Sequence, residues 1–260
     1  MNTKFLDLKN KNVIISGGSG FLGEQISETF INQGSNVFIL DLIKPLSNLK
    51  ACYLKTDITK EFHLKKILSY FKKKKIKIDI LINSAAKDYV PTRKNKQTNK
   101  NNLKLENFSE KIWTSDINIG LKGSFLTTKI FGSYMAKFKS GIILNISSDL
   151  GIIAPNQEIY KGLDFIKPIT YSVVKHGIIG LTKYTASYWA KKNIRCNAIA
   201  PGGIFNNQDK KFINRINKII PIGRMANKNE YNDLILFLCS KSSSYITGSV
   251  IVSDGGRTIV

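Results

Sequence analysis

A tyrosine and a lysine stand four positions apart in the stretch YSVVK, at Tyr171 and Lys175. On a helix, this spacing places both side chains on one face. A tyrosine with a pKa of about 10 is a weak base at neutral pH. A nearby ammonium favours the phenolate and lowers that pKa. The pair could therefore move the proton that accompanies a hydride transfer.

Spacing alone does not select this pair, because about one such pair arises by chance in a chain so rich in tyrosine and lysine. Two other pairs have the same spacing: Tyr70/Lys74 and Tyr188/Lys192. Tyr171 differs in its position, because it opens a helical pattern after an apolar run that ends at Ser147 and Ser148. The other two pairs lie within or near the end of a helical pattern, where a solvated charged face explains them.

A second candidate site is the glycine-rich stretch SGGSGFLG, from Ser16 to Gly23. It contains Gly18-x-Gly20-x-x-Gly23, the dinucleotide-binding spacing, between an apolar run and a helical pattern. A pyrophosphate needs bare backbone N–H groups at a helix N-terminus, and a Cβ atom would block its approach. The stretch predicts a phosphate-binding loop, and the alternative is a plain tight turn.

The next apolar run, VFILD, ends at Asp41, 18 residues past Gly23. A carboxylate there can accept hydrogen bonds from an adenosine ribose and would repel a 2′-phosphate. No Arg or Lys lies inside the glycine loop. The cofactor is therefore expected to be NAD rather than NADP, a preference that the nearby Lys44 could soften.

The elements that would position these residues form a regular alternation. Continuous apolar runs of strand length are typical of strands buried on both faces. They cover residues 12–16, 36–41, 79–85, 141–148, 194–200 and 248–254. Segments with helical spacing separate them, and Gly34 is a helix stop signal. The pattern predicts one α/β domain over residues 1–260, a Rossmann-type doubly wound parallel sheet of about seven strands with helices on both faces. Ligands then bind at the carboxyl ends of the strands.

Two stretches interrupt the alternation, at 88–110 and 149–169. Each directly follows a predicted strand, so both should overhang the ligand crevice. Loops in that position commonly carry function, and 149–169 is predicted to be a substrate loop rather than a merely solvated one.

The chain carries a formal net charge of +22. The excess is mainly lysine spread along the chain, whereas specific nucleic-acid readers favour arginine. Biased codon usage gives the same pattern, and attraction of phosphate-bearing substrates is a milder interpretation. The three cysteines have no metal or disulfide spacing, and no signal peptide or membrane-length apolar run is present. We expect a cytoplasmic protein with no metal, no nucleic-acid partner and no membrane partner.

Taken together, the motifs resemble the short-chain dehydrogenase/reductase family. They run in order along nearly the whole chain: SGGSGFLG (16–23), TDIT (56–59), NSAA (83–86), ILNISS (143–148), YSVVK (171–175), NAIAPGG (197–203) and VSDGG (252–256). The resemblance implies an oxidoreductase that transfers hydride between a nicotinamide cofactor and a secondary alcohol or ketone.

The same resemblance implies roles for individual residues. Tyr171 would be the general acid/base, and Lys175 would lower its pKa and hold the nicotinamide ribose. Ser148 would bind the substrate oxygen, with Ser147 the less favoured candidate. The implied cofactor contacts, besides Tyr171 and Lys175, are Gly17, Gly20, Phe21, Leu22, Gly23, Asp41, Asp57, Ile58, Asn83, Ala85, Pro201 and Ile204. The family resemblance also implies a homotetramer or homodimer.

The sequence departs from the family pattern in its glycine loop and its helix asparagine. The loop also reads Gly17-x-x-Gly20-x-x-Gly23, closer to the extended branch of the family, although length and C-terminus fit the shorter branch. The family's catalytic asparagine would stand seven residues after Trp113 and three before Gly123, and that position is Gly120. Asn118 lies two residues before that position, so its side chain should point in a different direction around the helix. Water or backbone would replace the asparagine in the proton relay, or catalysis would differ.

A third departure concerns the gap between Ser148 and Tyr171, which is 23 residues and longer than the family's usual gap. The extra residues fall in 149–169 and should reshape the substrate pocket. Polar contacts to substrate could come from three residues there: Gln157, Glu158 and Tyr160.

The substrate is indicated only by resemblance. The stretch from NISSDLG to LTKY, residues 145–184, resembles a bacterial subgroup associated with surface-glycan and flagellin modification, which suggests a sugar, a sugar phosphate or a nucleotide sugar. A lysine-rich rim at 88–104 fits an anionic substrate and equally fits biased composition. The alternatives are a 3-oxoacyl or polyol dehydrogenase of the same family and an NAD-binding regulatory protein without turnover. The missing asparagine motivates the regulatory alternative, and the intact Ser148, Tyr171 and Lys175 argue against it.

Overall fold

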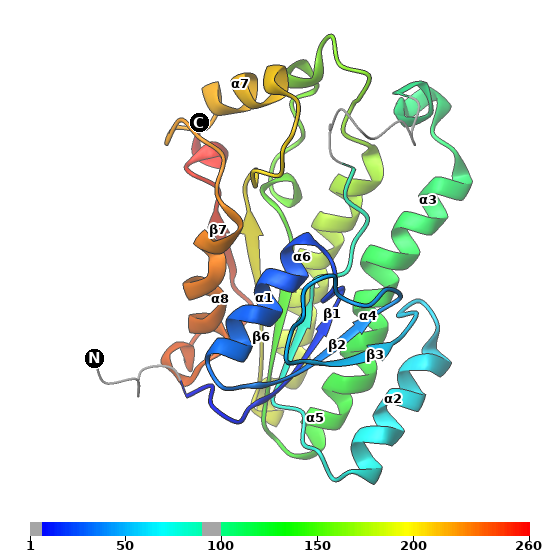
Figure 1. Cartoon of the computed structure of the whole chain (residues 1–260), viewed down its shortest axis with the longest axis vertical. Helices are drawn as coiled ribbons and strands as arrows, with labels where there is room; N and C mark the ends of the chain where they lie inside the picture. The colour runs from blue at the N-terminus through cyan, green and yellow to red at the C-terminus, as the bar shows by residue number, and fades with distance from the viewer. Residues whose placement is uncertain (1–6, 90–99) are drawn as a thin grey trace.

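A computed structural model describes residues 7–89 and 100–260 and contains one seven-stranded parallel sheet (Figure 1). The strands lie in the order β3-β2-β1-β4-β5-β6-β7. Their bounds are β1 (Asn12–Ser16), β2 (Asn36–Asp41), β3 (Cys52–Lys55), β4 (Ile80–Asn83), β5 (Gly141–Ile146), β6 (Ile194–Pro201) and β7 (Val250–Ser253). The predicted doubly wound sheet is confirmed. Its order reverses between β1 and β4, and a ligand crevice forms at such a point.

Helices cover both faces of the sheet. Their bounds are α1 (Phe21–Asn32), α2 (Glu61–Lys73), α3 (Glu110–Ile117), α4 (Gly123–Thr127), α5 (Ser133–Lys137), α6 (Ile169–Trp189), α7 (Lys210–Lys218) and α8 (Asn232–Leu238). Side chains alternate between faces along a strand, so Val13 and Ile15 pack with α1 and α8 while Ile14 packs with α2, α4 and α6. Strands buried on both faces therefore read as continuous apolar runs.

The segment 113–138, one of the segments with helical spacing, is not one regular helix. Two π-helical turns, Asn118–Lys122 and Thr128–Gly132, separate α3, α4 and α5. Turns of this kind widen a helix locally and are frequent at functional sites. The first π turn contains Gly120, the position at which the expected asparagine is missing.

Strand β3 was not among the predicted apolar runs. It has four residues at the edge of the sheet, and its two ends are exposed. Because its exposure and polar lysine break the apolar pattern, periodicity alone gives no signal for it.

The 149–169 stretch is a packed substructure rather than a solvated loop. It contains the 3₁₀ turn Gln157–Tyr160, and buried side chains of the stretch join a third apolar cluster with α7. The rings of Tyr160 and Phe212 stack with centroids 5.2 Å apart. Within residues 7–89 and 100–260, no helix has both the length and the apolar character needed to cross a membrane.

Candidate active site

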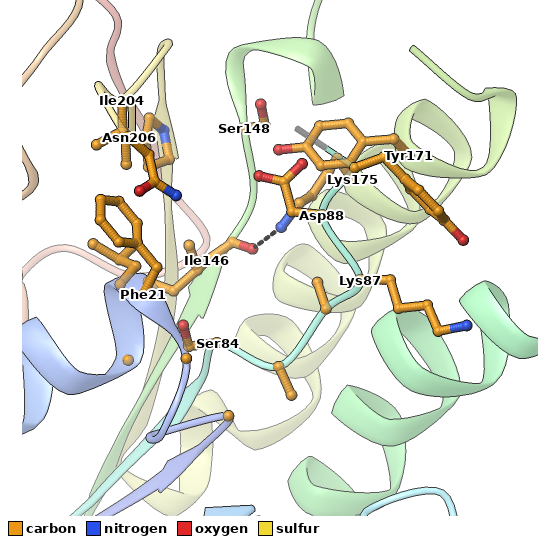
Figure 2. A pocket seen from close by; sticks show the side chains of 18 of the residues that line it. Phe21, Ser84, Lys87, Asp88, Ile146, Ser148, Tyr171, Lys175, Ile204 and Asn206 are labelled. Carbon is orange, nitrogen blue, oxygen red and sulfur yellow. Dashed lines mark hydrogen bonds between the residues drawn. The ribbon is translucent and has the colours of Figure 1, made fainter. Parts of the chain in front are cut away.

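A cavity of about 570 Å³ opens at the carboxyl ends of the central strands. Figure 2 shows Phe21, Ile204 and Asn206 on one side of this cavity, with Ser148 and Tyr171 on the other. The predicted residues that line it are Gly17, Gly20, Phe21, Leu22, Gly23, Asp41, Asp57, Ile58, Ala85, Pro201, Ile204, Ser148, Tyr171 and Lys175. The fold thus brings the glycine loop and the Tyr–Lys pair to one space.

The glycine loop is a tight connection between β1 and α1. Gly17 has a φ of +71°, and its N–H donates to Leu40 O at 2.9 Å. A Cβ atom on Gly23 would lie 2.0 Å from Gly17 O, so only glycine allows this close approach. Gly20 precedes the first turn of α1 and offers no capping side chain. The unpaired N–H groups of that first turn therefore fit a pyrophosphate.

Two carboxylates are fixed along the same wall of the cavity. Asp41 accepts from the backbone N–H of Ser19 at 3.1 Å and of Leu42 at 2.7 Å. Asp57 accepts from Thr59 N at 2.9 Å and Thr59 Oγ1 at 2.7 Å. Both carboxylates line the cavity in positions that suit an adenosine moiety.

Asn83 is the predicted cofactor residue that the structure does not bring to the cavity. Its side chain is buried and donates to Asn145 Oδ1 at 2.8 Å and Thr128 Oγ1 at 3.0 Å. Asn83 and Asn145 are register partners on β4 and β5, so the amide joins the two strands. The cavity wall after β4 is formed instead by the segment that begins with Ser84 and Ala85.

Ser148, Tyr171 and Lys175 meet at the end of β5. Lys175 is buried, and its Nζ donates to Ile146 O at 2.9 Å and lies 5.6 Å from the ring centroid of Tyr171. Ser148 Oγ donates to Asp149 Oδ1 at 2.7 Å. A hydroxyl, a phenol and an ammonium thus converge where a substrate oxygen could bind.

Burial dominates the ionisation of this pair. It raises the pKa of Tyr171 well above the ordinary value, Asp88 raises it further, and a hydrogen bond with Ser148 opposes both. Burial also lowers the pKa of Lys175 to about 8. This direction is opposite to the lowering of the Tyr171 pKa that the sequence predicts.

Gly120 faces α6 and has no room for a side chain. A Cβ atom there would lie 2.5 Å from Val174 Cγ1. Among the described residues that line the cavity, Asn118 is absent, as its early position predicts. Nearby, the buried Asp116 accepts from Thr170 Oγ1 at 2.7 Å and Tyr89 OH at 3.0 Å.

The predicted polar contacts from 149–169 are only partly placed at the cavity. Tyr160 lines it, whereas Gln157 and Glu158 are exposed and do not. Residues 90–99 of the lysine-rich rim lie outside the described residues.

Sequence reasoning missed five charged residues at the cavity: Lys87, Asp88, Asp149, Lys167 and Arg257. Asp149 and Arg257 form a buried ion pair at 2.6 Å, although 108 positions separate them. Asp149 directly follows Ser148, and Arg257 directly follows the VSDGG motif. These neighbouring positions were the signal available in the sequence. Lys167 had no signal, because nothing distinguishes it from the other lysines of the chain.

Comparisons with known proteins agree with this geometry. A family model described as enoyl-(acyl carrier protein) reductase matches residues 19–258. An NAD-dependent glycerol dehydrogenase from Listeria innocua is 31% identical over 268 residues, covering 98% of this chain and 97% of that protein. A 3-oxoacyl-[acyl-carrier-protein] reductase from Thermotoga maritima is 31% identical over 269 residues, covering 97% and 99%.

A solved structure has the same architecture. The crystal structure of a short chain dehydrogenase from Leptospira borgpetersenii, with bound NAD+, superimposes with a TM-score of 0.87 at 31% identity. The match covers 96% of this chain and 93% of that chain.

Proposed function

The chain belongs to the short-chain dehydrogenase/reductase family and is an NAD(P)-dependent oxidoreductase, and from this premise we propose that it uses NAD to interconvert a secondary alcohol and a ketone on a sugar or polyol derivative. The observation that carries the proposal is the single cavity shared by the glycine loop and by Ser148, Tyr171 and Lys175.

The residues present fit a dinucleotide. Gly17, Gly20 and Gly23 leave the space that a pyrophosphate needs, and Asp41 stands where a ribose would be bound. The fixed carboxylate of Asp41 supports NAD over NADP because it would repel a 2′-phosphate. When bound, the nicotinamide supplies hydride-transfer chemistry.

The chain's own residues handle the proton. In oxidation, the alcohol loses a hydride from carbon and a proton from oxygen, and the proton moves to Tyr171 Oη. In reduction, Tyr171 Oη gives that proton to the ketone oxygen, which Ser148 Oγ holds by a hydrogen bond. The Lys175 ammonium is fixed at Ile146 O beside Tyr171 and favours the phenolate.

Polar groups at the substrate end of the cavity support a polyhydroxylated substrate. Asp88, Lys167 and Tyr160 line that end and offer both acceptors and donors to hydroxyl groups. The relative named as a glycerol dehydrogenase supports a polyol. The resemblance to the surface-glycan subgroup supports a sugar derivative in that kind of biosynthesis.

A 3-oxoacyl substrate is the second candidate. Apolar side chains also line the substrate end, among them Leu150, Phe212 and Met225. An acyl chain could pack against them, and the 3-oxoacyl reductase relative points the same way.

The test begins with fluorescence titrations of the purified protein with NADH and NADPH. Turnover is then followed at the nicotinamide absorbance with polyols, aldoses, sugar phosphates, nucleotide sugars and a 3-oxoacyl thioester. Tighter NADH binding with turnover of a sugar or polyol supports the proposal, and turnover of the thioester alone supports the second candidate. NADH binding without any turnover contradicts both and favours a regulatory NAD-binding protein.

We also propose a homodimer or homotetramer. Exposed aromatic side chains on α6 support it, since Tyr184 and Tyr188 stack with centroids 5.7 Å apart on the surface. Light scattering after size-exclusion chromatography measures the assembly, and a monomer at micromolar concentration contradicts it.

A further inference from the structure

We propose that Lys167 is a positioning residue for the reaction: the 149–169 segment delivers a second ammonium to the ring of Tyr171, where it favours the deprotonated side chain. This inference rests on the proposed function, in which Tyr171 accepts and gives the proton. It concerns a residue of the long segment between Ser148 and Tyr171.

Lys167 is the nearer of the two ammonium groups to the tyrosine ring. Its Nζ lies 3.7 Å from the centroid of Tyr171, against 5.6 Å for Lys175. The Lys167 side chain is only 10% exposed, so water screens its charge weakly. A cation over an aromatic face is attracted to the ring, and deprotonation of the hydroxyl strengthens that attraction.

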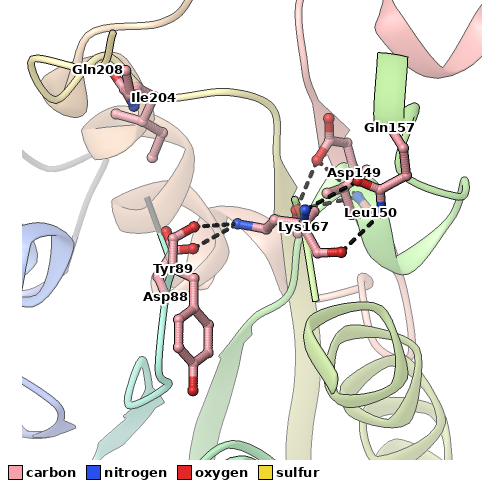
Figure 3. A network of polar contacts seen from close by, with 9 residues as sticks. Asp88, Tyr89, Asp149, Leu150, Gln157, Lys167, Ile204 and Gln208 are labelled. Carbon is pink, nitrogen blue, oxygen red and sulfur yellow. Dashed lines mark hydrogen bonds and ion pairs between the residues drawn. The ribbon is translucent and has the colours of Figure 1, made fainter. Parts of the chain in front are cut away.

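The segment holds the backbone of Lys167 with a single amide side chain. Gln157 Nε2 donates to Lys167 O at 2.9 Å, and Lys167 N donates to Gln157 Oε1 at 3.1 Å (Figure 3). Both backbone polar groups of Lys167 are thus bound by one residue of the same segment. This exposed, bidentate contact fixes the position from which the lysine side chain reaches the cavity.

The ammonium itself is held from the opposite wall. Lys167 Nζ donates to Asp88 Oδ1 at 2.7 Å and to Tyr89 O at 3.3 Å, and both acceptors follow strand β4 (Figure 3). The side chain therefore spans the cavity between two segments that are 78 or more positions apart in sequence. Its direction over the ring is set by contacts on both sides.

Charged and titratable groups lie around Tyr171 on several elements: Lys175 on α6, Lys167 and Tyr160 on the 149–169 segment, Asp88 after β4 and Asp149 after β5. Asp116 on α3 lines a second, small cavity with Tyr171, and its carboxylate pairs with Lys87 at 3.5 Å. Asp149 is neutralised by its pairing with Arg257. Asp88 opposes deprotonation of Tyr171, but its side chain is 53% exposed and partly screened. Lys167, whose side chain is largely buried, therefore offsets part of the cost of ionising the partly buried phenol.

The position of Lys167 also has an opposing effect, on Lys175. Lys167 lowers the pKa of Lys175, because the two ammonium groups repel each other. Removal of Lys167 should therefore leave Lys175 more firmly protonated and still raise the pKa of Tyr171. An experiment on Tyr171 ionisation separates the two effects.

The first experiment measures kcat/KM for alcohol oxidation against pH, with the substrate found in the panel above. The ascending limb reports deprotonation of the general base. Lys167→Met should move this limb to higher pH by about one unit, whereas Lys167→Arg, which keeps the charge, should leave it within a few tenths of a unit. Lys161→Met is the matched control on the same segment, because its side chain is exposed and points to solvent beside Glu158. An unmoved limb in Lys167→Met overturns the proposal, whatever happens to kcat or to thermal stability.

Lys167→Met also leaves the Asp88 carboxylate without its ion-pair partner. A second pair of variants removes this side effect. Asp88→Asn alone should move the limb to lower pH, and adding Lys167→Met to it should move the limb back up. If the double variant matches Asp88→Asn, the ammonium has no effect of its own and the proposal fails.

An equilibrium measurement separates this proposal from the proposed function. Ionisation of Tyr171 is followed by the phenolate absorbance of the NAD-saturated protein, as the difference between each protein and its Tyr171→Phe counterpart. The midpoint should be higher in Lys167→Met than in wild type and Lys167→Arg, even if no substrate is turned over. Equal midpoints in wild type, Lys167→Arg and Lys167→Met contradict the role of Lys167.

Discussion

Lys175 is buried and Tyr171 is partly buried, and burial shifts the pKa values of the two groups in opposite directions. The phenol resists losing its proton, and the ammonium loses its proton more readily than in water. Burial therefore shifts each side chain toward its neutral form. The charged forms are stabilised only by groups brought to them, which makes the neighbours of this pair part of its chemistry.

Replacing Tyr171 by phenylalanine removes the hydroxyl and keeps the ring. We expect kcat to fall by about 10³-fold or more, because no other described phenol lies beside Lys175 to move the proton. NADH affinity should change by less than about threefold, since the ring still fills its place. Steady-state kinetics and a fluorescence titration check both values, and retained turnover would show that Tyr171 is not the acid/base.

Lys175 should make stability depend on pH in the alkaline range. Its pKa is about 8 in the folded protein against 10.5 ordinarily, so between these values the unfolded chain binds more protons than the folded one. Stability contributed by this residue therefore rises as pH increases from about 8 to about 10.5. Relative to Lys175→Met, the wild type should gain on the order of 3 kcal/mol across that range.

Urea denaturation of the two proteins at pH values from neutral to alkaline measures this difference. The methionine variant keeps a similar volume but cannot titrate. A stability gap that stays constant with pH would show that burial does not lower the pKa of Lys175.

Individual residues were predictable where the signal is local. Ser148, Tyr171 and Lys175 follow from a strand end and one helix start, so their meeting at the cavity follows from the sheet topology. Lys167 could not be predicted in this way. Its place depends on the path of the 149–169 segment and on a contact with Asp88 across the cavity.

The helical stretch from α3 to α5 is shaped by its contact with α6. Gly120 lies in the first π turn, directly against Val174. The close approach of the two helices therefore excludes a side chain at the position where the family resemblance implies asparagine.

Gly120→Asn should destabilise the protein by about 1–3 kcal/mol, because its Cβ would lie 2.5 Å from Val174 Cγ1 in a packed interface. Combining it with Val174→Ala should recover part of that loss, since the clashing methyl groups are gone. Gly180→Ala on α6 is the control, because nothing lies within 4 Å of its Cβ position, and it should stabilise the helix by up to about 1 kcal/mol. Thermal or urea unfolding ranks the variants, and a neutral Gly120→Asn would contradict the close packing.

Helices and strands whose apolar residues form a regular pattern were predicted correctly. Elements without such a pattern were not. The glycine loop connects β1 to α1 at Phe21 as predicted, and Gly34, with a φ of +74°, follows the end of α1. The edge strand β3 and the two π turns were missed. An exposed edge strand has no regular burial pattern, and a π turn depends on packing against a neighbouring helix.

At the scale of the whole molecule, two buried thiols lie in the apolar clusters on opposite faces of the sheet. Cys196 lies in β6 and Cys239 directly follows α8, both essentially inaccessible, and burial raises the pKa of each to about 12. Cys52 begins the edge strand β3 and is exposed. The reactivity of the three thiols therefore shows whether the packing on the two faces of the sheet is intact.

The folded protein should react with one equivalent of N-ethylmaleimide near neutral pH, at Cys52. The reagent must reach the sulfur, which is accessible at Cys52 and inaccessible at Cys196 and Cys239, and burial raises the pKa of all three thiols. Mass spectrometry of the native and urea-unfolded protein should count one and three adducts respectively. Rapid native labelling of Cys196 would contradict the packing of the β6 face.

The ion pair of Asp149 and Arg257 has a consequence for the order in which the chain folds during synthesis. The ribosome adds Ser148, Tyr171 and Lys175 well before β7 and Arg257, so a growing chain for a time holds the reactive groups without the cation. Burying a carboxylate that lacks its partner is costly, and the turn that carries Ser148 should stay open during that interval. Chain order thus keeps the turn that carries Ser148 open until the segment with β7 and Arg257 has been added.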